Sequence, residues 1–314
     1  MSANLTIRAM RESDLGEADR VFRLAFGTWF QVPDPMRFRG DAGLFAPRLR
    51  AYPDGGIVAE QDGAIVALCF ASRWGSLGVL GPLAVLPHLW RQGVARQMLG
   101  PTLDIFARWG CRAAGLFTFP WSATHVRLYQ DFGFWPRHLI TIVQKPVGAA
   151  PAIEGALSLR NNPARRAALA AACQALAGSI YDGLDLRREI EGVLRPGMGD
   201  VVLLQADGGM TGFAICHNGK GSEGNSKNCY IKFGLVRSGN GAPQRMTQLI
   251  AACEAHAREQ GLPVISTGAN AGRHGTYRLL HELGFRMQLQ GVTMHRPWVE
   301  AYDRPDIFAL DDWR

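Results

Sequence analysis

The chain has 314 residues, of which 47% are hydrophobic and 19% are charged. One hydrophobic core seldom grows much beyond ~250 residues, so this length predicts two packed domains. The high hydrophobic content and modest charge exclude a disordered chain. The net charge of +7 favours an anionic partner, but the arginines are dispersed, which fits a phosphate-bearing cofactor at least as well as nucleic acid. We expect a cytoplasmic protein without a membrane partner, because the sequence has neither a signal-peptide pattern nor an apolar run that spans a bilayer. Six scattered cysteines without a C-x-x-C pair predict reduced thiols and no metal site.

The first half of the chain has the pattern of an open sheet with helical connections. An opening strand leads to a helix that Ser13 or Asp14 can cap, then to a hairpin, a further strand and a long amphipathic helix. Another strand, a short helix that ends at Gly133 and a final strand complete the half. The expected ranges are 5–8 for the opening strand, 56–60 and 64–72 for the hairpin, 79–86 for the next strand, and 93–109 and 122–132 for the helices. This order predicts an α+β layer fold.

The second half of the chain repeats the first. Residues 127–134, RLYQDFGF, match residues 278–285, RLLHELGF, at an offset of 151, and the same offset relates Gly110 to Gly261. The same elements follow in the same order: a strand over 157–160, a helix over 164–177, strands over 201–205, 211–217 and 230–237, and a helix over 244–260. The repeat predicts two copies of one fold at 1–147 and 152–298, with a linker between them and a tail at 299–314.

A glycine-led turn between the strand over 79–86 and the following helix is the clearest chemical signal. The turn runs from Pro87 to Arg96 and contains Gly93 directly before the helix. Backbone N–H groups at such a junction face outward, and the positive end of the helix dipole lies behind them, so that the turn can hold a pyrophosphate. Arg91 and Arg96 flank it and can pair with further phosphates.

The turn and its surroundings resemble the GNAT N-acetyltransferase superfamily, whose acetyl-CoA loop has the pattern Q/R-x-x-G-x-G/A. Gly93 and Ala95 match the last two motif positions, whereas Trp90 replaces the first. The resemblance covers nearly all of both halves. It implies two tandem GNAT-like domains, each a mixed, mostly antiparallel sheet flanked by helices, with acetyl-CoA as cosubstrate and no metal.

The resemblance also implies where the cofactor lies. In this superfamily the pantetheine arm pairs with backbone groups beside a bulge in the fourth strand, and Gly81-Pro82 is suited to such a bulge, although an ordinary edge strand also accommodates a proline. Ser122 stands where the family often has asparagine. The residues expected to contact the cofactor are Leu83, Ala84, Val85, Trp90, Arg91, Gln92, Gly93, Val94, Ala95, Arg96 and Ser122.

The segment 128–134, LYQDFGF, resembles the family's L-Y-x-x-x-G-F element, whose tyrosine commonly protonates the departing CoA thiolate. Tyr129 is therefore the expected general acid, since a phenol of pKa ~10 can donate to a thiolate without being ionised itself at neutral pH. A packed aromatic is the alternative interpretation. His125 lies one helical turn earlier and is the first candidate for a base, with His88 and His138 as further candidates. A surface or hydrogen-bonded histidine is the alternative interpretation of each. Ordered water, or binding of an amine that is already neutral, needs no base residue.

The second copy departs from the motif at each of these positions. Residues 238–245, SGNGAPQR, replace the turn; Pro243 removes an amide donor, and the repeat offset places Gln244 at the position of Gly93. Leu280 replaces Tyr129. We therefore expect a degenerate copy that keeps the fold and has lost the cofactor.

Residues 26–45 are rich in aromatic residues, glycine and proline, which suits a flexible lid with an apolar wall over an acceptor. Helix core beneath a loop is an equal alternative. The expected substrate contacts are Trp29, Phe30 and Arg37, and Arg37 with Arg39 favours an acceptor that carries a carboxylate. Three functions remain open. The first is acetyl transfer to a primary amine of a small molecule or peptide; the second is a non-catalytic acyl-CoA-binding or regulatory module; the third is a tRNA-dependent tandem-GNAT aminoacyl transferase, against which the intact CoA loop argues. The pattern does not determine the oligomeric state.

Overall fold

The computed structural model describes residues 5–148, 153–206 and 209–314. The predicted order of strands and helices is present in both halves, and the α+β class is confirmed. Two short helices, α2 (Phe45–Ala51) and α6 (Arg187–Val193), and the small strand β13 (Ala309–Leu310) are additional, and the predicted linker lies largely outside the described residues.

The first half contains β1 (Leu5–Ala9), α1 (Leu15–Trp29), α2 (Phe45–Ala51), β2 (Gly56–Gln61), β3 (Ala64–Trp74), β4 (Leu77–Val85), α3 (Val94–Arg108), β5 (Ala113–Thr118), α4 (Ala123–Gln130) and β6 (Trp135–Pro146). The second half contains β7 (Ala156–Ser158), α5 (Arg166–Ile180), α6 (Arg187–Val193), β8 (Gly199–Ala206), β9 (Gly209–Gly219), β10 (Asn225–Val236), α7 (Ala242–Glu259), β11 (Val264–Asn270), α8 (His274–Glu282), β12 (Arg286–Arg296) and β13 (Ala309–Leu310).

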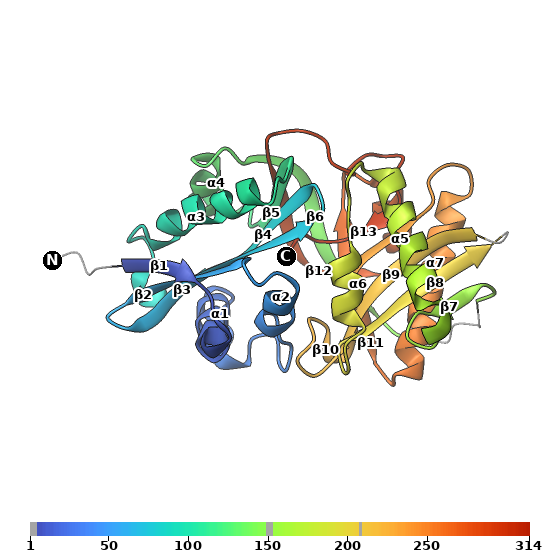
Figure 1. Ribbon diagram of the computed structural model, residues 1–314, viewed down its shortest axis with the longest axis horizontal. Coiled ribbons are helices and arrows are strands. Elements are labelled where there is room, and N and C mark those ends of the chain that lie inside the picture. Colours follow the sequence, from blue (N-terminus) through green and yellow to red (C-terminus); the bar gives the residue numbers. More distant parts are fainter. Residues whose placement is uncertain (1–4, 149–152, 207–208) are drawn as a thin grey trace.

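The two halves exchange their last long strands. Twelve strands form one path in the order β1-β2-β3-β4-β5-β12-β6-β11-β10-β9-β8-β7, with β13 beside β10. β12, from the second half, pairs with β5 of the first half, whereas β6 pairs with β11 of the second half and with β12. In Figure 1 both exchanged strands lie at the junction of the two halves. Each half therefore supplies a strand that the other needs to continue its sheet.

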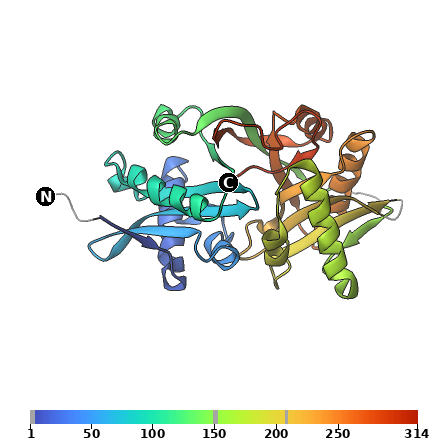
Figure 2. The same ribbon diagram turned by 45° about the horizontal axis from the view of Figure 1, so that its top comes forward.

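Helices cover both faces of the sheet, because successive side chains of a strand point to opposite faces. In the first half, α1 and α2 lie on one face and α3 on the other (Figures 1 and 2). Residues 213–216 of β9 show this alternation in the second half. Phe213 and Ile215 pack in the core beneath α5 and α6, whereas Ala214 and Cys216 pack on the opposite face, beneath α7. Among the described residues, none of the helices combines the length and apolarity needed to cross a membrane.

The core beneath α5 and α6 extends across the junction. Trp74, Leu77 and Val79 of the first half belong to the same buried apolar cluster as Phe213 and Phe233 of the second. The Trp74 ring meets Phe233 edge-on, with 5.5 Å between the ring centroids. The junction is thus a continuous hydrophobic core rather than a polar contact between two finished domains.

Residues 299–314, expected only as a tail, are an integral part of this junction. Tyr302 and Trp313 are 0% and 2% exposed, and the indole Nε1 of Trp313 donates a hydrogen bond of 2.8 Å to the Tyr302 hydroxyl. Trp313 packs directly on β5, so closely that a Cβ added to Gly115 would lie 2.1 Å from the indole ring. The segment therefore fastens the second half to the first.

A chain truncated after residue 147 should aggregate, because β6 would lose both of its strand neighbours and the apolar face at Trp74 and Val79 would be uncovered. Size-exclusion chromatography with light scattering measures this. The matched control is the full-length chain cut by a protease site placed within residues 148–152, whose two pieces should elute together as one particle because the exchanged strands still hold them. A soluble, monomeric 1–147 fragment would contradict the prediction.

Candidate functional site

Strands β4 and β5 separate midway along their length. They pair in parallel from Leu77 opposite Ala113 to Leu80 opposite Leu116, and the pairing stops there although β4 continues to Val85. On its other side, β4 pairs with β3 through a register shift between Leu80 and Leu83, which places the expected bulge at Gly81-Pro82. The backbone of residues 83–85 consequently faces the gap between the two strands without a partner in β5.

The turn after β4 presents an open helix N-terminus. Gly93 caps α3 with φ +79°, a left-handed conformation that favours glycine, and a Cβ added there would meet no atom within 4 Å. Arg91, at φ +63°, and Gln92 are exposed beside it. The first amides of α3 and the positive end of its dipole thus face open space, as a phosphate-binding site requires.

Trp90, at the first position of the turn, has a structural contact of its own. Its indole Nε1 donates a hydrogen bond of 2.7 Å to the carbonyl of Val85, which ties the turn to the end of β4. Arg96 pairs with Asp131 at 2.7 Å and keeps 56% of its side chain exposed. The tryptophan therefore shapes the turn, whereas the arginine remains accessible from solvent.

Tyr129 lies on α4 beside the gap. Its ring belongs to the core of the first half and meets Phe134 edge-on, with 6.4 Å between the centroids. Burial raises the pKa of the phenol, so the hydroxyl stays protonated at neutral pH. The hydroxyl has no hydrogen-bond partner among the described residues. Ser122 begins the same helix, and its side-chain oxygen accepts a hydrogen bond of 3.4 Å from the backbone N–H of His125.

Aromatic side chains at the end of α1, directly after β5 and on α4 lie against one another. The rings of Trp29 and His125 lie 4.7 Å apart, and Phe30 meets Phe119 edge-on at 5.4 Å. Burial lowers the pKa of His125, which favours the neutral imidazole at pH 7. Trp29, Phe30, Phe119 and His125 together are called the aromatic wall below. The structure thus brings together two of the three predicted substrate contacts with the second predicted catalytic residue.

The third predicted substrate contact, Arg37, lies elsewhere. Its side chain is 85% exposed and pairs with Asp34 at 3.3 Å. Arg39, two residues later, is half-buried and donates a hydrogen bond of 2.8 Å to the backbone carbonyl of Glu223 in the second half. Of the two arginines in this loop, Arg39 therefore faces the interior of the protein.

The loop between α1 and α2 is held by hydrogen bonds along its length and at its far end. The guanidinium of Arg23 donates hydrogen bonds of 2.6, 2.8 and 2.9 Å to the carbonyls of Phe38, Gly40 and Ala42. Backbone hydrogen bonds of 3.0 and 2.9 Å then join Gly43 to Ser222 and Gly221 to Asp41. The buried side chain of Arg23 thus satisfies backbone carbonyls of a loop that has no regular backbone pairing. Gly221 and Ser222 of the second half hold the far end of the loop.

A buried ion pair crosses the junction beside the β4 bulge. Arg48 of α2 donates to the carboxylate of Glu223 at 2.6 and 3.2 Å, and both side chains are at most 4% exposed. The same guanidinium donates to the carbonyl of Gly81 at 2.9 Å. Sequence reasoning missed these residues, because nothing in the local pattern relates positions 175 residues apart.

In the second copy the corresponding gap is filled by the protein itself. β10 and β11 pair in parallel only as far as Ile231 opposite Thr267. Beyond that point β13 pairs with β10, placing Leu310 opposite Gly234, and the N–H of Val236 donates a hydrogen bond of 3.1 Å to the carbonyl of Phe308. Backbone that is unpaired in the first copy is therefore paired here.

The helix N-terminus of the second copy is also covered. Gly241, and not Gln244 as the repeat offset suggested, takes the place of Gly93, since it caps α7 with the same φ of +79°. The offset fails here because the preceding turn differs in length. A Cβ on Gly241 would lie 3.1 Å from Nη1 of Arg245, whose guanidinium donates to the carbonyls of Arg237 and Asn240 at 2.7 and 2.9 Å. The Arg245 side chain thus lies against the N-terminus of α7, and Pro243 in the first turn offers no amide there.

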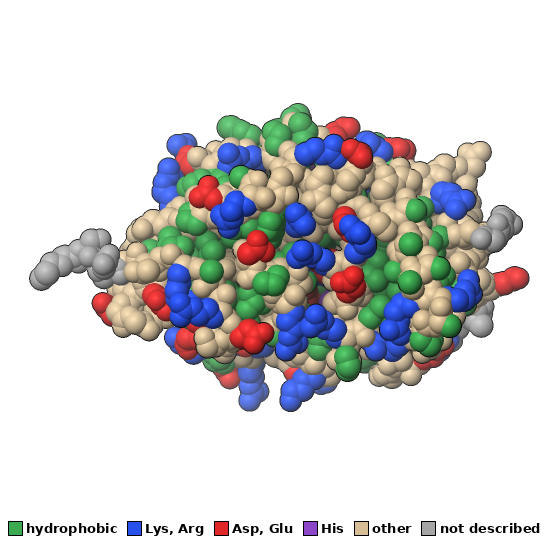
Figure 3. Space-filling view, viewed as in Figure 1, with side chains coloured by type: hydrophobic (Ala, Val, Ile, Leu, Met, Phe, Trp, Pro, Cys, Tyr) green, Lys and Arg blue, Asp and Glu red, His purple; other side chains and the backbone are tan. Residues whose placement is uncertain are grey.

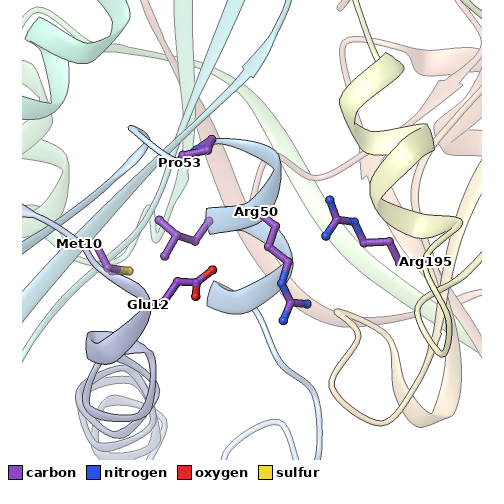
Figure 4. A pocket seen from close by; sticks show the side chains of 6 residues that line it. Met10, Glu12, Arg50, Pro53 and Arg195 are labelled. Carbon is purple, nitrogen blue, oxygen red and sulfur yellow. The ribbon is translucent and has the colours of Figure 1, made fainter.

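A surface hollow of about 360 Å³ lies between α2 and the segment after α6. Figure 4 shows Arg50 and Arg195 beside it, one from each half, with Glu12 and Met10 across from them. None of the predicted site residues lines this hollow. On the face shown in Figure 3, basic and acidic side chains are interspersed and form no continuous basic track.

Comparisons with known proteins agree with this architecture. The Acetyltransferase (GNAT) family matches residues 19–134. A putative acetyltransferase from Pyrococcus horikoshii superimposes with a TM-score of 0.71 at 15% identity, over 98% of this chain and 95% of that one. A GCN5-related N-acetyltransferase from Sphaerobacter thermophilus gives 0.61 at 15% identity, over 96% and 97% of the two chains. A tandem GNAT protein from the clavulanic acid biosynthesis pathway gives 0.60 at 13% identity, over 93% and 98%.

No curated protein matches the sequence. The solved structures share the fold over the whole chain, and the family match lies in the half that keeps the open turn. The protein therefore has the tandem GNAT architecture, and its first half belongs to the GNAT acetyltransferase family.

Proposed function

We propose that the protein transfers the acetyl group of acetyl-CoA directly to a primary amine of a small molecule or peptide, at a single active site in the first copy. The observation that supports this most is the contrast between two equivalent helix N-termini. Gly93 faces open space, whereas Gly241 is covered by Arg245. Only the first copy also combines this N-terminus with a tyrosine beside the gap.

The residues of the first copy suit the cofactor in two places. Amides at the start of α3, with Arg91, Gln92 and Arg96 exposed around them, suit the pyrophosphate. The edge of β4 that faces the gap, which lacks a partner in β5 at residues 83–85, suits the pantetheine arm, which carries amide groups of its own. Acetyl-CoA supplies the acetyl group as an activated thioester. The role of the protein is to orient it, exclude water and move protons.

Tyr129 is the proposed proton donor to the leaving thiolate. Its raised pKa keeps the proton available throughout the neutral range, and its unpaired hydroxyl is free to donate. His125 is the proposed acceptor of the amine proton, since its lowered pKa keeps the ring neutral and able to accept. Burial thus keeps both groups in the protonation state that the proposal requires, with the phenol protonated and the imidazole neutral.

One molecule of acetyl-CoA should bind per chain, and Gly93→Ala should weaken that binding strongly. The new Cβ would be strained at φ +79° and would lie where the pyrophosphate approaches the backbone. Gly241→Ala is the matched control, since it imposes the same strain on an N-terminus that is already covered. Isothermal titration calorimetry measures both. Two molecules per chain, or loss of binding in Gly241→Ala alone, would contradict the proposed site.

Tyr129→Phe should lower kcat roughly 10- to 1000-fold and leave the Kd for acetyl-CoA nearly unchanged, because a proton donor is needed only as the thiolate leaves. In the wild type, the alkaline decline of kcat due to this residue should lie above pH ~10, the ordinary pKa of tyrosine, because burial raises the pKa. Full turnover of the phenylalanine variant with a proven acceptor would mean that the tyrosine is structural. The protein would then be closer to a non-catalytic acyl-CoA-binding module.

His125→Phe should lower kcat/KM about tenfold or more, because it keeps the stacking on Trp29 but removes the proton acceptor. In the wild type the neutral imidazole should persist somewhat below pH ~6.5, so activity that depends on it should decline only below that value. The measurement is kcat/KM against pH for both proteins. An unchanged profile in the variant would reduce His125 to a part of the aromatic wall.

A further inference from the structure

The carbonyl of Gly81 lies where β4 separates from β5. Pairing with β5 stops at Leu80, and the register of β4 with β3 passes from Leu80 directly to Leu83, so that neither strand pairs with Gly81. Gly81 is buried, and a buried carbonyl without a partner in the sheet needs a hydrogen-bond donor from elsewhere. Arg48 of α2 is that donor, since its Nη1 lies 2.9 Å from the Gly81 oxygen.

Arg48 is itself oriented by the second half of the chain. Its Nε and Nη2 donate to the two carboxylate oxygens of Glu223 at 3.2 and 2.6 Å, the paired geometry of a guanidinium and a carboxylate. Nη2 also donates to the backbone oxygen of Arg314 at 2.6 Å. Because a guanidinium is planar and rigid, a carboxylate that holds one edge of it also sets the direction in which Nη1 points toward Gly81.

Further buried contacts hold the carboxylate of Glu223 in place. Nζ of Lys232 donates to Glu223 at 2.6 Å and to Glu189 at 2.9 Å. Glu189 in turn accepts hydrogen bonds of 3.0 Å from the hydroxyl of Tyr52 and from Nε1 of Trp74, both in the first half. Burial alone would raise the pKa of Glu223, but its two cationic partners outweigh this and hold that pKa well below its ordinary value. The carboxylate is therefore ionised throughout the neutral range.

We propose that Glu223 of the second copy is a positioning residue for acetyl-CoA in the first copy. By orienting Arg48 it fixes the carbonyl of Gly81, and with it the edge of β4 at residues 83–85 that receives the pantetheine arm. This inference rests on the proposed binding of acetyl-CoA in the first copy. It gives the second copy a role in the active site that requires no cofactor of its own.

The two ends of acetyl-CoA should therefore respond differently to loss of Glu223. The turn that suits the pyrophosphate, residues 87–96, makes no hydrogen bond to Arg48 or Glu223 among the described residues. The nucleotide half of the cofactor, 3′-phospho-ADP, carries the pyrophosphate but no pantetheine arm, so its binding depends on the turn alone. Binding of acetyl-CoA depends on the turn and on β4.

Calorimetry with these two ligands tests the proposal. Glu223→Gln should weaken acetyl-CoA binding roughly tenfold, the value of about one hydrogen bond, and leave the Kd of 3′-phospho-ADP unchanged. Glu189→Gln is the matched control, because it makes the same change at a buried glutamate that contacts Lys232 but does not hydrogen-bond to Arg48. It should leave both Kd values unchanged. Equal weakening of both ligands, or the same loss in Glu189→Gln, would overturn the positioning role.

A double-mutant cycle determines whether Glu223 acts through Arg48. Arg48→Met should weaken acetyl-CoA binding about as much as Glu223→Gln does, and the double variant should bind it no more weakly than either single variant. Additive losses would contradict an effect that passes through Arg48. The double variant also covers a single variant that fails to fold, as reported by its melting temperature, because removing both partners leaves neither as an unpaired buried charge. It should show the same difference between acetyl-CoA and 3′-phospho-ADP.

Amide hydrogen exchange separates this proposal from the proposed function. In the ligand-free protein, residues 83–85 should exchange faster in Glu223→Gln than in the wild type or Glu189→Gln, because the bulge before them is held less firmly. If the wild type binds no acetyl-CoA, the proposed function is contradicted, and exchange at β4 then decides the positioning role alone. If it binds acetyl-CoA but acetylates no amine, the two Kd values still decide it. Unchanged exchange at residues 83–85 in Glu223→Gln would overturn the proposal.

Discussion

The exchange of β6 and β12 is the constraint on which the rest of the architecture depends. Because β12 pairs with β5, the second half reaches the sheet of the first immediately beside the gap between β4 and β5. The connection that follows β12 then returns across the junction, fills the gap between β10 and β11 and ends against β4. Strand pairing of this kind positions the two copies more rigidly than a linker could, which explains how residues far apart in sequence, such as Arg48 and Glu223, come into contact across the junction.

The two copies use the same framework in opposite ways. In the first, the edge of β4 that faces the gap has no partner in β5 beyond Leu80 and the N-terminus of α3 is open, so both suit a ligand that can form hydrogen bonds with them. In the second, β13 and Arg245 satisfy the equivalent groups internally. The second copy thus differs from the first by more than its motif residues, because other parts of the chain occupy the positions that are open in the first copy. The second copy then contributes contacts to the first, through Glu223 and the segment that ends at Arg314.

Local features of the sequence predicted the fold well because they depend on local physics. Alternation of apolar residues predicted the hairpin strands, and Gly93 with Ala95 predicted the helix start after β4. The repeat predicted two copies, but it could not predict that β6 and β12 change places, since either pairing satisfies the same side-chain pattern. Arg37 and Arg39 are indistinguishable by composition, and the inward position of Arg39 depends on a contact with the distant Glu223 that has no local signal. The contribution of residue 314 has no local signal, as it depends on pairing between β10 and β13.

The exchanged strands have a consequence for how the chain folds during synthesis. The β5 edge has to wait for β12, whose Val292 pairs with Thr118. Such non-local pairing raises the contact order and slows folding, since the loop must close before the contacts are gained. The first half therefore leaves the ribosome with an uncovered strand edge and an apolar face, and it must remain in that state until the second half has been made. A protein of this design depends on chaperones, or on rapid completion of its own translation, more than two independent domains of the same size would.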